Sequence, residues 1–244
     1  MRLIQITDCH LHADPQARSR TGLPHRQLER VVAAAAGLRP DMVLMTGDIS
    51  EDRTAASYAE AERLLAPLAC PWFWLPGNHD EPGLMADCRP FHETLDLGQR
   101  RLLLLDTQRI GQEAGELGEA RLTALAERLA EDDRPTLVAM HHPPVAVGSA
   151  WMDALGLTDA DAFWDVVAGH AHVEAVICGH IHQAFVGRGP ESAGGVPVYG
   201  CPSSSDQFLP GAEDFAVDEA SRPGFRVIDL TRESLSTWVE RVDL

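Results

Sequence analysis

Long apolar runs are missing from this chain of 244 residues, and so is any regular cysteine spacing. No run approaches the roughly 18 apolar residues that a membrane-spanning helix needs. The apolar run within residues 1–8 is too short for a secretory signal and has no cleavage site after it. Five cysteines, an odd number, do not fit a disulfide framework. We therefore expect a cytoplasmic protein with reduced thiols.

Basic residues are scarce as well. Twenty Lys and Arg stand against 37 Asp and Glu, which gives a net charge of −17. Tight nucleic-acid binding rests on basic side chains that meet phosphates, so this balance argues against it. The same excess of acidic residues argues against binding to an anionic membrane surface and favours solubility. We expect a small-molecule substrate, no nucleic-acid or membrane partner, and a monomer or homodimer.

What the chain does contain is an alternation of short apolar runs and longer segments of helical period. Continuous apolar runs separated by helices favour parallel strands that are buried on both faces. The predicted strands span residues 3–7, 42–46, 72–75, 102–105, 136–140 and 174–178. Helical periodicity predicts helices over residues 24–36, 54–68 and 118–130.

The last third of the chain has a different character. Its apolar runs at 196–199, 225–230 and 235–242 are separated by Gly, Pro and Ser turns, with no long helix between them. We expect antiparallel strands here, in a second sheet or in an extension of the first. No repeat or linker divides the sequence. The prediction is an α/β fold with one domain over residues 1–244.

Five polar clusters each begin just past the end of an apolar run. In open α/β sheets, ligands bind at the carboxyl ends of the strands. Parallel strands would bring all of the clusters to one edge, which is the strongest functional indication in the sequence. The clusters are Asp8-Cys9-His10, Gly47-Asp48, Gly77-Asn78-His79-Asp80, His141-His142-Pro143-Pro144 and Gly179-His180-Ile181-His182.

The clusters offer carboxylate, amide and imidazole ligands. This mixture suits iron, manganese or zinc. Because there are more ligands than one tetrahedral centre needs, we predict two divalent ions that share a bridging carboxylate. Two such ions clamp phosphoryl oxygens and make hydroxide available at neutral pH. The predicted ligands are Asp8, His10, Asp48, Asn78, His141, His180 and His182.

One imidazole of the third cluster is left without a metal. His79 is placed to protonate a leaving alkoxide or to stabilise developing charge. Its neighbour Asp80 either forms the turn or orients a nearby imidazole. Asp48 has two candidate roles, as a helix cap or as a bridging ligand, and its position directly after a buried run favours the bridging role. His141 directly ends its strand, so we prefer it to His142, which we expect to support the site or to pack.

A second Gly-His-X-His string occurs at residues 169–172. It follows a helical segment that opens at residues 158–161, so Gly169 is interpreted as a helix stop and His170 as a residue near the negative end of the helix dipole. We therefore predict structural roles for His170 and His172. The cysteines next to the clusters, Cys9, Cys178 and Cys201, are interpreted as small buried residues.

Together the five clusters resemble the pattern of calcineurin-like metallophosphoesterases, which is Asp-X-His, Gly-Asp, Gly-Asn-His-(Asp/Glu), His before Pro, and Gly-His-X-His. The resemblance implies a four-layer α/β/β/α sandwich of two mixed sheets. It also implies one metal on Asp8, His10, Asp48 and His182, and a second on Asp48, Asn78, His141 and His180. His79 would then lie beside the scissile phosphate. The residues expected to contact substrate are His10, Asp48, Asn78, His79 and His182.

A closer resemblance is to bacterial class III 3′,5′-cyclic-AMP phosphodiesterases. It includes the segments 75–80, 103–108, 149–153, 178–183, 202–208 and 223–226, although Cys9 departs from the small hydroxyl or apolar residue common in the family. It implies hydrolysis of cyclic AMP to 5′-AMP by a metal-bridging hydroxide. The alternative is a glycerophosphodiesterase or broad-specificity phosphodiesterase with the same centre. A non-catalytic scaffold is disfavoured because no ligand is missing, and a metallo-β-lactamase-type hydrolase because its His-X-His-X-Asp-His string is absent.

Overall fold

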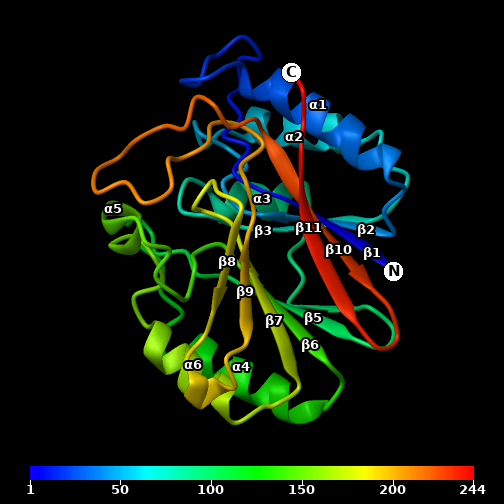
Figure 1. Ribbon diagram of the computed structural model, residues 1–244. Coiled ribbons are helices and arrows are strands. Elements are labelled where there is room, and N and C mark those ends of the chain that lie inside the picture. Colours follow the sequence, from blue (N-terminus) through cyan, green and yellow to red (C-terminus); the bar gives the residue numbers. More distant parts are fainter.

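Two mixed β-sheets face each other in the computed structural model, which describes residues 1–244 (Figure 1). The first sheet has the strand order β11-β10-β1-β2-β3, so both ends of the chain contribute to it. Strands β1, β2 and β3 are parallel, whereas β10 is antiparallel to β1 and to β11. The bounds are β1 Arg2–Ile6, β2 Met42–Thr46, β3 Trp72–Leu75, β10 Gly224–Leu230 and β11 Leu235–Arg241.

The second sheet has the order β4-β5-β6-β7-β9-β8. Its centre, from β5 through β6 and β7 to β9, is parallel, and the edge strands β4 and β8 are antiparallel to their neighbours. The bounds are β4 Thr94–Asp96, β5 Arg101–Leu105, β6 Thr136–Met140, β7 Val173–Cys178, β8 Phe185–Arg188 and β9 Pro197–Gly200.

Helices cover the outer face of each sheet. The first sheet packs against α1 (Pro24–Gly37), α2 (Ala55–Leu65) and α3 (Pro82–Cys88), and the second against α4 (Gly118–Glu131) and α6 (Ala160–Ala168). Helix α1 opens on a proline, whose fixed φ suits a first turn. Helix α2 is capped by the Thr54 side chain, which accepts the Ser57 N–H. The 3-10 turn η1 (Glu191–Ala193) packs against α6 and contributes Ala193 to the same core as that helix, whereas the short helix α5 (Ala150–Asp153) buries Met152.

The alternation of side chains along each strand produces three hydrophobic cores. On β2, Val43 and Met45 pack toward the helices, whereas Met42 and Leu44 pack between the sheets. On β6, Val138 joins the helix-side core of the second sheet. Because successive side chains point to opposite faces, a continuous apolar run is buried on both faces. The result is the expected four-layer α/β/β/α sandwich.

The expectation for the last third of the chain was partly wrong. Strands β10 and β11 are antiparallel, but β9 pairs in parallel with β7. These strands extend both sheets instead of forming one of their own. Pairing partners depend on tertiary packing, which the local pattern does not contain. None of the helices is both long and apolar enough to span a bilayer.

Candidate metal centre

The five polar clusters meet where the carboxyl ends of strands from the two sheets come together. Three follow β1, β2 and β3 of the first sheet, and two follow β6 and β7 of the second. The expectation of one sheet edge therefore needs a correction, since the clusters converge from two facing edges. The convergence itself depends on strand polarity, because every cluster follows its strand and none precedes it.

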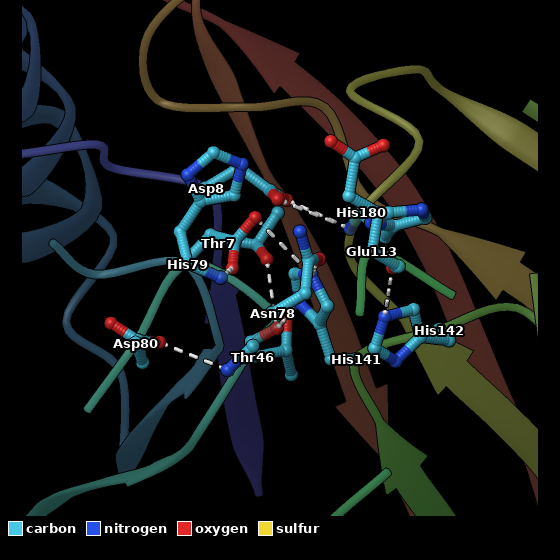
Figure 2. Close-up of polar contacts among 12 residues, drawn as sticks. Thr7, Asp8, Thr46, Asn78, His79, Asp80, Glu113, His141, His142 and His180 are labelled. Carbon is cyan, nitrogen blue, oxygen red and sulfur yellow. Dashed lines mark hydrogen bonds and ion pairs between the residues drawn. The ribbon is translucent and has the colours of Figure 1, made fainter. Parts of the chain in front are cut away.

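One half of the site joins β1 to the loop after β7. The Asp8 carboxylate is fully buried and accepts the backbone N–H of His180 at 3.0 Å (Figure 2). Its Oδ1 lies 3.2 Å from His182 Nε2, which lies 3.2 Å from His10 Nε2. The other ring nitrogen of His182, Nδ1, is 2.8 Å from the carbonyl oxygen of Asp206. That contact leaves His182 Nε2 as the nitrogen that faces Asp8 and His10.

The other half joins β2, β3 and β6. His141 Nδ1 is 2.7 Å from the Thr46 carbonyl oxygen, which fixes the ring and directs Nε2 into the site. His141 Nε2 lies 3.1 Å from Asn78 Oδ1 and 3.3 Å from Asp48 Oδ2. The same Asp48 oxygen lies 3.8 Å from His10 Nε2. Asp48 is thus the carboxylate that reaches both halves.

Backbone strain is concentrated in this cluster. Seven residues other than glycine have a positive φ, and five of them are predicted ligands: Asp8, His10, Asp48, His180 and His182. Such a conformation is uncommon for residues with a Cβ and persists only where the surroundings enforce it. The tight turns aim consecutive side chains into one space.

Two glycines allow the loops to approach each other. Gly47 has a φ of +94°, and a Cβ there would come within 2.5 Å of His141 Nδ1. A Cβ on Gly77 would overlap the Asp48 carboxylate. Because only glycine fits these positions, the backbone can pass directly behind the ligand side chains.

The site favours positive charge. Burial alone would lower the pKa of His141, but the Asp48 and Asp8 carboxylates raise it to about 9. The pKa of His10 also rises to about 9, because Glu51 and Asp48 outweigh burial. By contrast, burial together with His142 and His141 holds the pKa of His180 well below its usual value. An unprotonated imidazole is the form that binds a metal ion.

The donor set fits divalent metal ions. Four groups of side chains have donor atoms within 4.8 Å of one another: Asp8, His10 and His182; Asp8, Asp48 and His141; His10, Asp48 and His79; and His141, His142 and His180. His180 Nε2 is buried without a hydrogen-bond partner, as expected of an atom whose partner is an ion. Imidazole nitrogens beside carboxylate oxygens bind borderline divalent ions. The chemistry of these residues therefore matches the predicted cofactor class.

His79 lies at the rim of the cluster and is partly exposed. Its backbone N–H donates to Asp48 Oδ1 at 2.9 Å, and its Nδ1 lies 3.1 Å from Glu51 Oε2. The ring meets that of His10 edge-on, with centroids 4.9 Å apart. Hydrogen bonding to Glu51 raises the pKa of His79, which favours the protonated imidazole. A proton donor beside the metal cluster is what this geometry can supply.

Glu51 and Arg53 contact the predicted site residues, and the sequence patterns did not indicate either of them. Glu51 Oε2 lies 2.7 Å from His10 Nδ1 as well as near His79, so one carboxylate holds two imidazoles. Arg53 donates to the backbone carbonyls of Asn78 and His79 and thereby fixes their turn. The only indication in the sequence was that Glu51 stands three residues after Asp48. That spacing does not reveal contacts with residues that lie far away in the sequence.

Asp80 forms a tie between two ligand turns. Its buried carboxylate accepts the backbone N–H groups of Ile49, Ser50 and Gly77. The structure therefore shows a turn-forming role and no imidazole oriented by Asp80. Burial, then the nearby charge of Asp48, raises the pKa of Asp80 to about 6.

Three further histidines lie outside the predicted ligand set. His142 is fully buried, with Nδ1 2.8 Å from Thr107 Oγ1. Its Nε2 lies 3.0 Å from the carbonyl oxygen of Glu113, and both residues are labelled in Figure 2. Both of its nitrogens are already engaged, although its ring packs beside His180. His170 and His172 lie before β7, at the opposite end of that strand from His180.

The five cysteines are free thiols. Those next to the clusters, Cys9, Cys178 and Cys201, are fully buried, as expected, and burial raises the pKa of Cys178 to about 12. They are therefore protonated at neutral pH and behave as small core residues.

A cavity of about 760 Å³ opens above the cluster. Its floor includes His10, Asp48, Asn78, His79 and His182. Arg18 and Arg20, on the loop over residues 11–23, also line the cavity. Five of the seven predicted ligands, His10, Asp48, Asn78, His180 and His182, thus line a space that is large enough for a small molecule.

Comparisons with known proteins agree with this geometry. Residues 1–184 match a family model described as calcineurin-like phosphoesterase. The chain is 37% identical to a protein of Vibrio vulnificus named 3′,5′-cyclic adenosine monophosphate phosphodiesterase CpdA, over 99% of this chain and 90% of that protein. A protein of the same name from Pseudomonas aeruginosa is 36% identical over the same shares.

A solved structure has the same architecture. A dimetal phosphatase from Danio rerio superposes with a TM-score of 0.74 at 15% identity, covering 99% of this chain and 96% of the other. At this level of identity the likeness supports the fold.

Proposed function

The chain belongs to the calcineurin-like phosphoesterase family, and on that premise we propose that it hydrolyses 3′,5′-cyclic AMP to 5′-AMP. The observation that carries the proposal is the meeting of the seven candidate ligands in one cluster, five of which line one cavity together with His79. The proteins named for this activity align over 99% of this chain, which supports the same conclusion.

We assign the ligands to two divalent ions, of iron, manganese or zinc. Asp8, His10 and His182 would hold one ion and Asn78, His141 and His180 the other, with Asp48 shared between them. The support is geometric, since Asp48 Oδ2 lies between His10 and His141 at 3.8 and 3.3 Å. When bound, the ions supply Lewis acidity and lower the pKa of water, so that hydroxide is available at neutral pH.

The residues around the cavity floor would hold the phosphate for in-line attack. In the reaction, the oxygen of a water molecule forms a bond to phosphorus and the bond from phosphorus to O3′ breaks. His79 donates its proton to O3′ as that bond breaks, and the proton released by the water restores the imidazolium. Glu51 holds His79 Nδ1, so that Nε2 is free to face the substrate. We expect His10, Asp48, Asn78 and His182 to surround the phosphate with His79.

A substrate panel on metal-reconstituted protein tests this function. Turnover of cyclic AMP, a glycerophosphodiester and a chromogenic diester is compared, and the nucleotide product is identified by chromatography. We expect the highest kcat/KM with cyclic AMP and 5′-AMP as the product. Faster turnover of the glycerophosphodiester would support that alternative function instead, and formation of 3′-AMP would contradict cleavage at O3′.

A further inference from the structure

One wall of the cavity differs in chemistry from its floor. Trp151, Phe208 and Phe215 form an aromatic cluster, in which the ring centroids of each pair lie 5.1 to 5.4 Å apart. All three line the cavity. Trp151 belongs to α5, and the two phenylalanines lie on the long loop before β10, beside α5 in Figure 1. A compact apolar wall above a polar floor indicates a ligand that has an apolar flat part and a charged part.

The aromatic wall begins directly at the metal cluster. The Phe208 ring stacks on the His182 ring with centroids 3.9 Å apart and planes within 5°. A phosphate held at the floor therefore has an aromatic surface next to it. In a cyclic nucleotide the base is attached one ribose away from the phosphate, so it would reach this wall and not the open solvent.

A guanidinium completes the wall. Arg20 lies over the Phe215 ring at 4.6 Å and also lines the cavity. Its backbone is fixed, because the Asp206 carboxylate accepts bonds from Ser19, Arg20 and Thr21. Its side chain makes no hydrogen bond or ion pair with the protein, although the chain has 37 acidic residues. Its N–H donors therefore remain free, and a guanidinium has donors only. The ring nitrogens of a purine are matching acceptors.

We propose that Trp151, Phe208, Phe215 and Arg20 form the nucleobase subsite, which selects cyclic nucleotides over diesters without a base. This rests on the proposed function for the position of the phosphate. Phe215 is 45% exposed, so a stacked base would cover an aromatic surface that otherwise faces water. Stacking tolerates any base, and the larger purines are favoured by their greater stacking area.

The test compares two substrates in wild type, two variants of Phe215 and one control variant. Cyclic AMP and a ribose 3′,5′-cyclic phosphate without a base are assayed with wild type, Phe215→Ala and Phe215→Trp. The matched control is Leu209→Ala, because Leu209 is 44% exposed on the same loop and does not line the cavity. We expect Phe215→Ala to lower kcat/KM for cyclic AMP about 5- to 100-fold more than for the base-free substrate, mainly through KM. Phe215→Trp should retain the preference, and Leu209→Ala should leave it unchanged.

Equal losses on both substrates in Phe215→Ala, or a wild type that turns over both equally well, would overturn the subsite. Failure of the proposed function looks different, because wild type would then not hydrolyse cyclic AMP at all. In that case titration calorimetry with 5′-AMP and ribose 5-phosphate decides the subsite. Tighter binding of 5′-AMP that Phe215→Ala abolishes supports it, and equal binding of the two overturns it.

Discussion

The same Gly-His-X-His string stands at both ends of β7, and the two copies have different surroundings. The copy at residues 169–172 precedes the strand, where burial and the nearby Arg101 lower the pKa of His172. The copy at 179–182 follows the strand, where the backbone N–H of His180 meets Asp8. Each copy has a buried ring nitrogen without a partner, on His172 and on His180. Only the second copy lies among the other predicted metal ligands.

Strand β2 shows the same contrast with carboxylates. Asp41 precedes the strand, is exposed and accepts the Arg2 N–H at 2.6 Å. Asp48 follows the strand and lies in the centre of the site. Residue type alone therefore does not decide function in this fold. What distinguishes Asp48 from Asp41 is its position after the strand, because the carboxyl ends of parallel strands lie at one edge of the sheet.

The contrast along β2 gives the largest expected effect. Asp48→Ala removes the carboxylate that reaches both halves of the site, and we expect kcat/KM for cyclic AMP to fall at least ~10⁴-fold, since bound metals supply several kcal/mol of transition-state stabilisation. Asp41→Ala is the matched control and should retain wild-type turnover. Steady-state kinetics on both variants checks this. A similar loss in both would show that strand position is not what matters.

Among the residues at the carboxyl ends of the strands, metal binding and proton donation should be separable by mutation. His79→Ala leaves the predicted ligands in place but removes the proton donor, so we expect two bound metals and turnover lowered by about 10²–10⁴-fold. Elemental analysis and kinetics on the same preparation measure both quantities. Unchanged turnover would rule out the role assigned to His79.

The two histidine strings give the direct test along β7. His182→Ala should weaken metal binding at least ~100-fold, because loss of even an outer partner costs about 10–100-fold. Activity at limiting metal should fall accordingly and recover in part with excess metal. His172→Ala, at the other end of the strand, should retain both metal and activity. Metal titration followed by activity distinguishes the variants, and equal sensitivity would remove the contrast.

The smallest expected effect concerns the carboxylate that holds two imidazoles. Glu51→Gln should lower kcat/KM about 10–100-fold. Because the Glu51 carboxylate stabilises the imidazolium of His79, its loss should lower the pKa of that group. His79 then loses its proton at a lower pH, and because the reaction needs the protonated form, the basic limb of the pH profile shifts to lower pH. A shift in the opposite direction would contradict the pairing.

Much of the fold could be predicted from local sequence. The strands at 42–46, 72–75 and 136–140 have the predicted bounds, because each is a continuous apolar run that ends at turn residues. Helix α3 and strands β4 and β8 were missed, since segments of three to seven residues carry too little periodicity. The distribution of strands between two sheets was not predictable from local pattern, because it depends on tertiary pairing.

The site shows the same limit. The proximity of the predicted ligands could be predicted because each belongs to a cluster that follows a strand. Glu51 contacts His10 across 41 residues of sequence and Arg53 contacts the His79 carbonyl across 26, so no local pattern announced either role. Phe208 and Phe215 lie on an irregular loop, where neither period nor spacing indicates a shared wall.

The metal content of Asp48→Ala beside Asp41→Ala tests the central claim most directly. Elemental analysis after reconstitution and removal of free metal counts the ions per chain. We predict two ions per chain in wild type and in Asp41→Ala, and fewer than two in Asp48→Ala, because the shared carboxylate is gone. Two full equivalents in Asp48→Ala would contradict a centre that is built around Asp48.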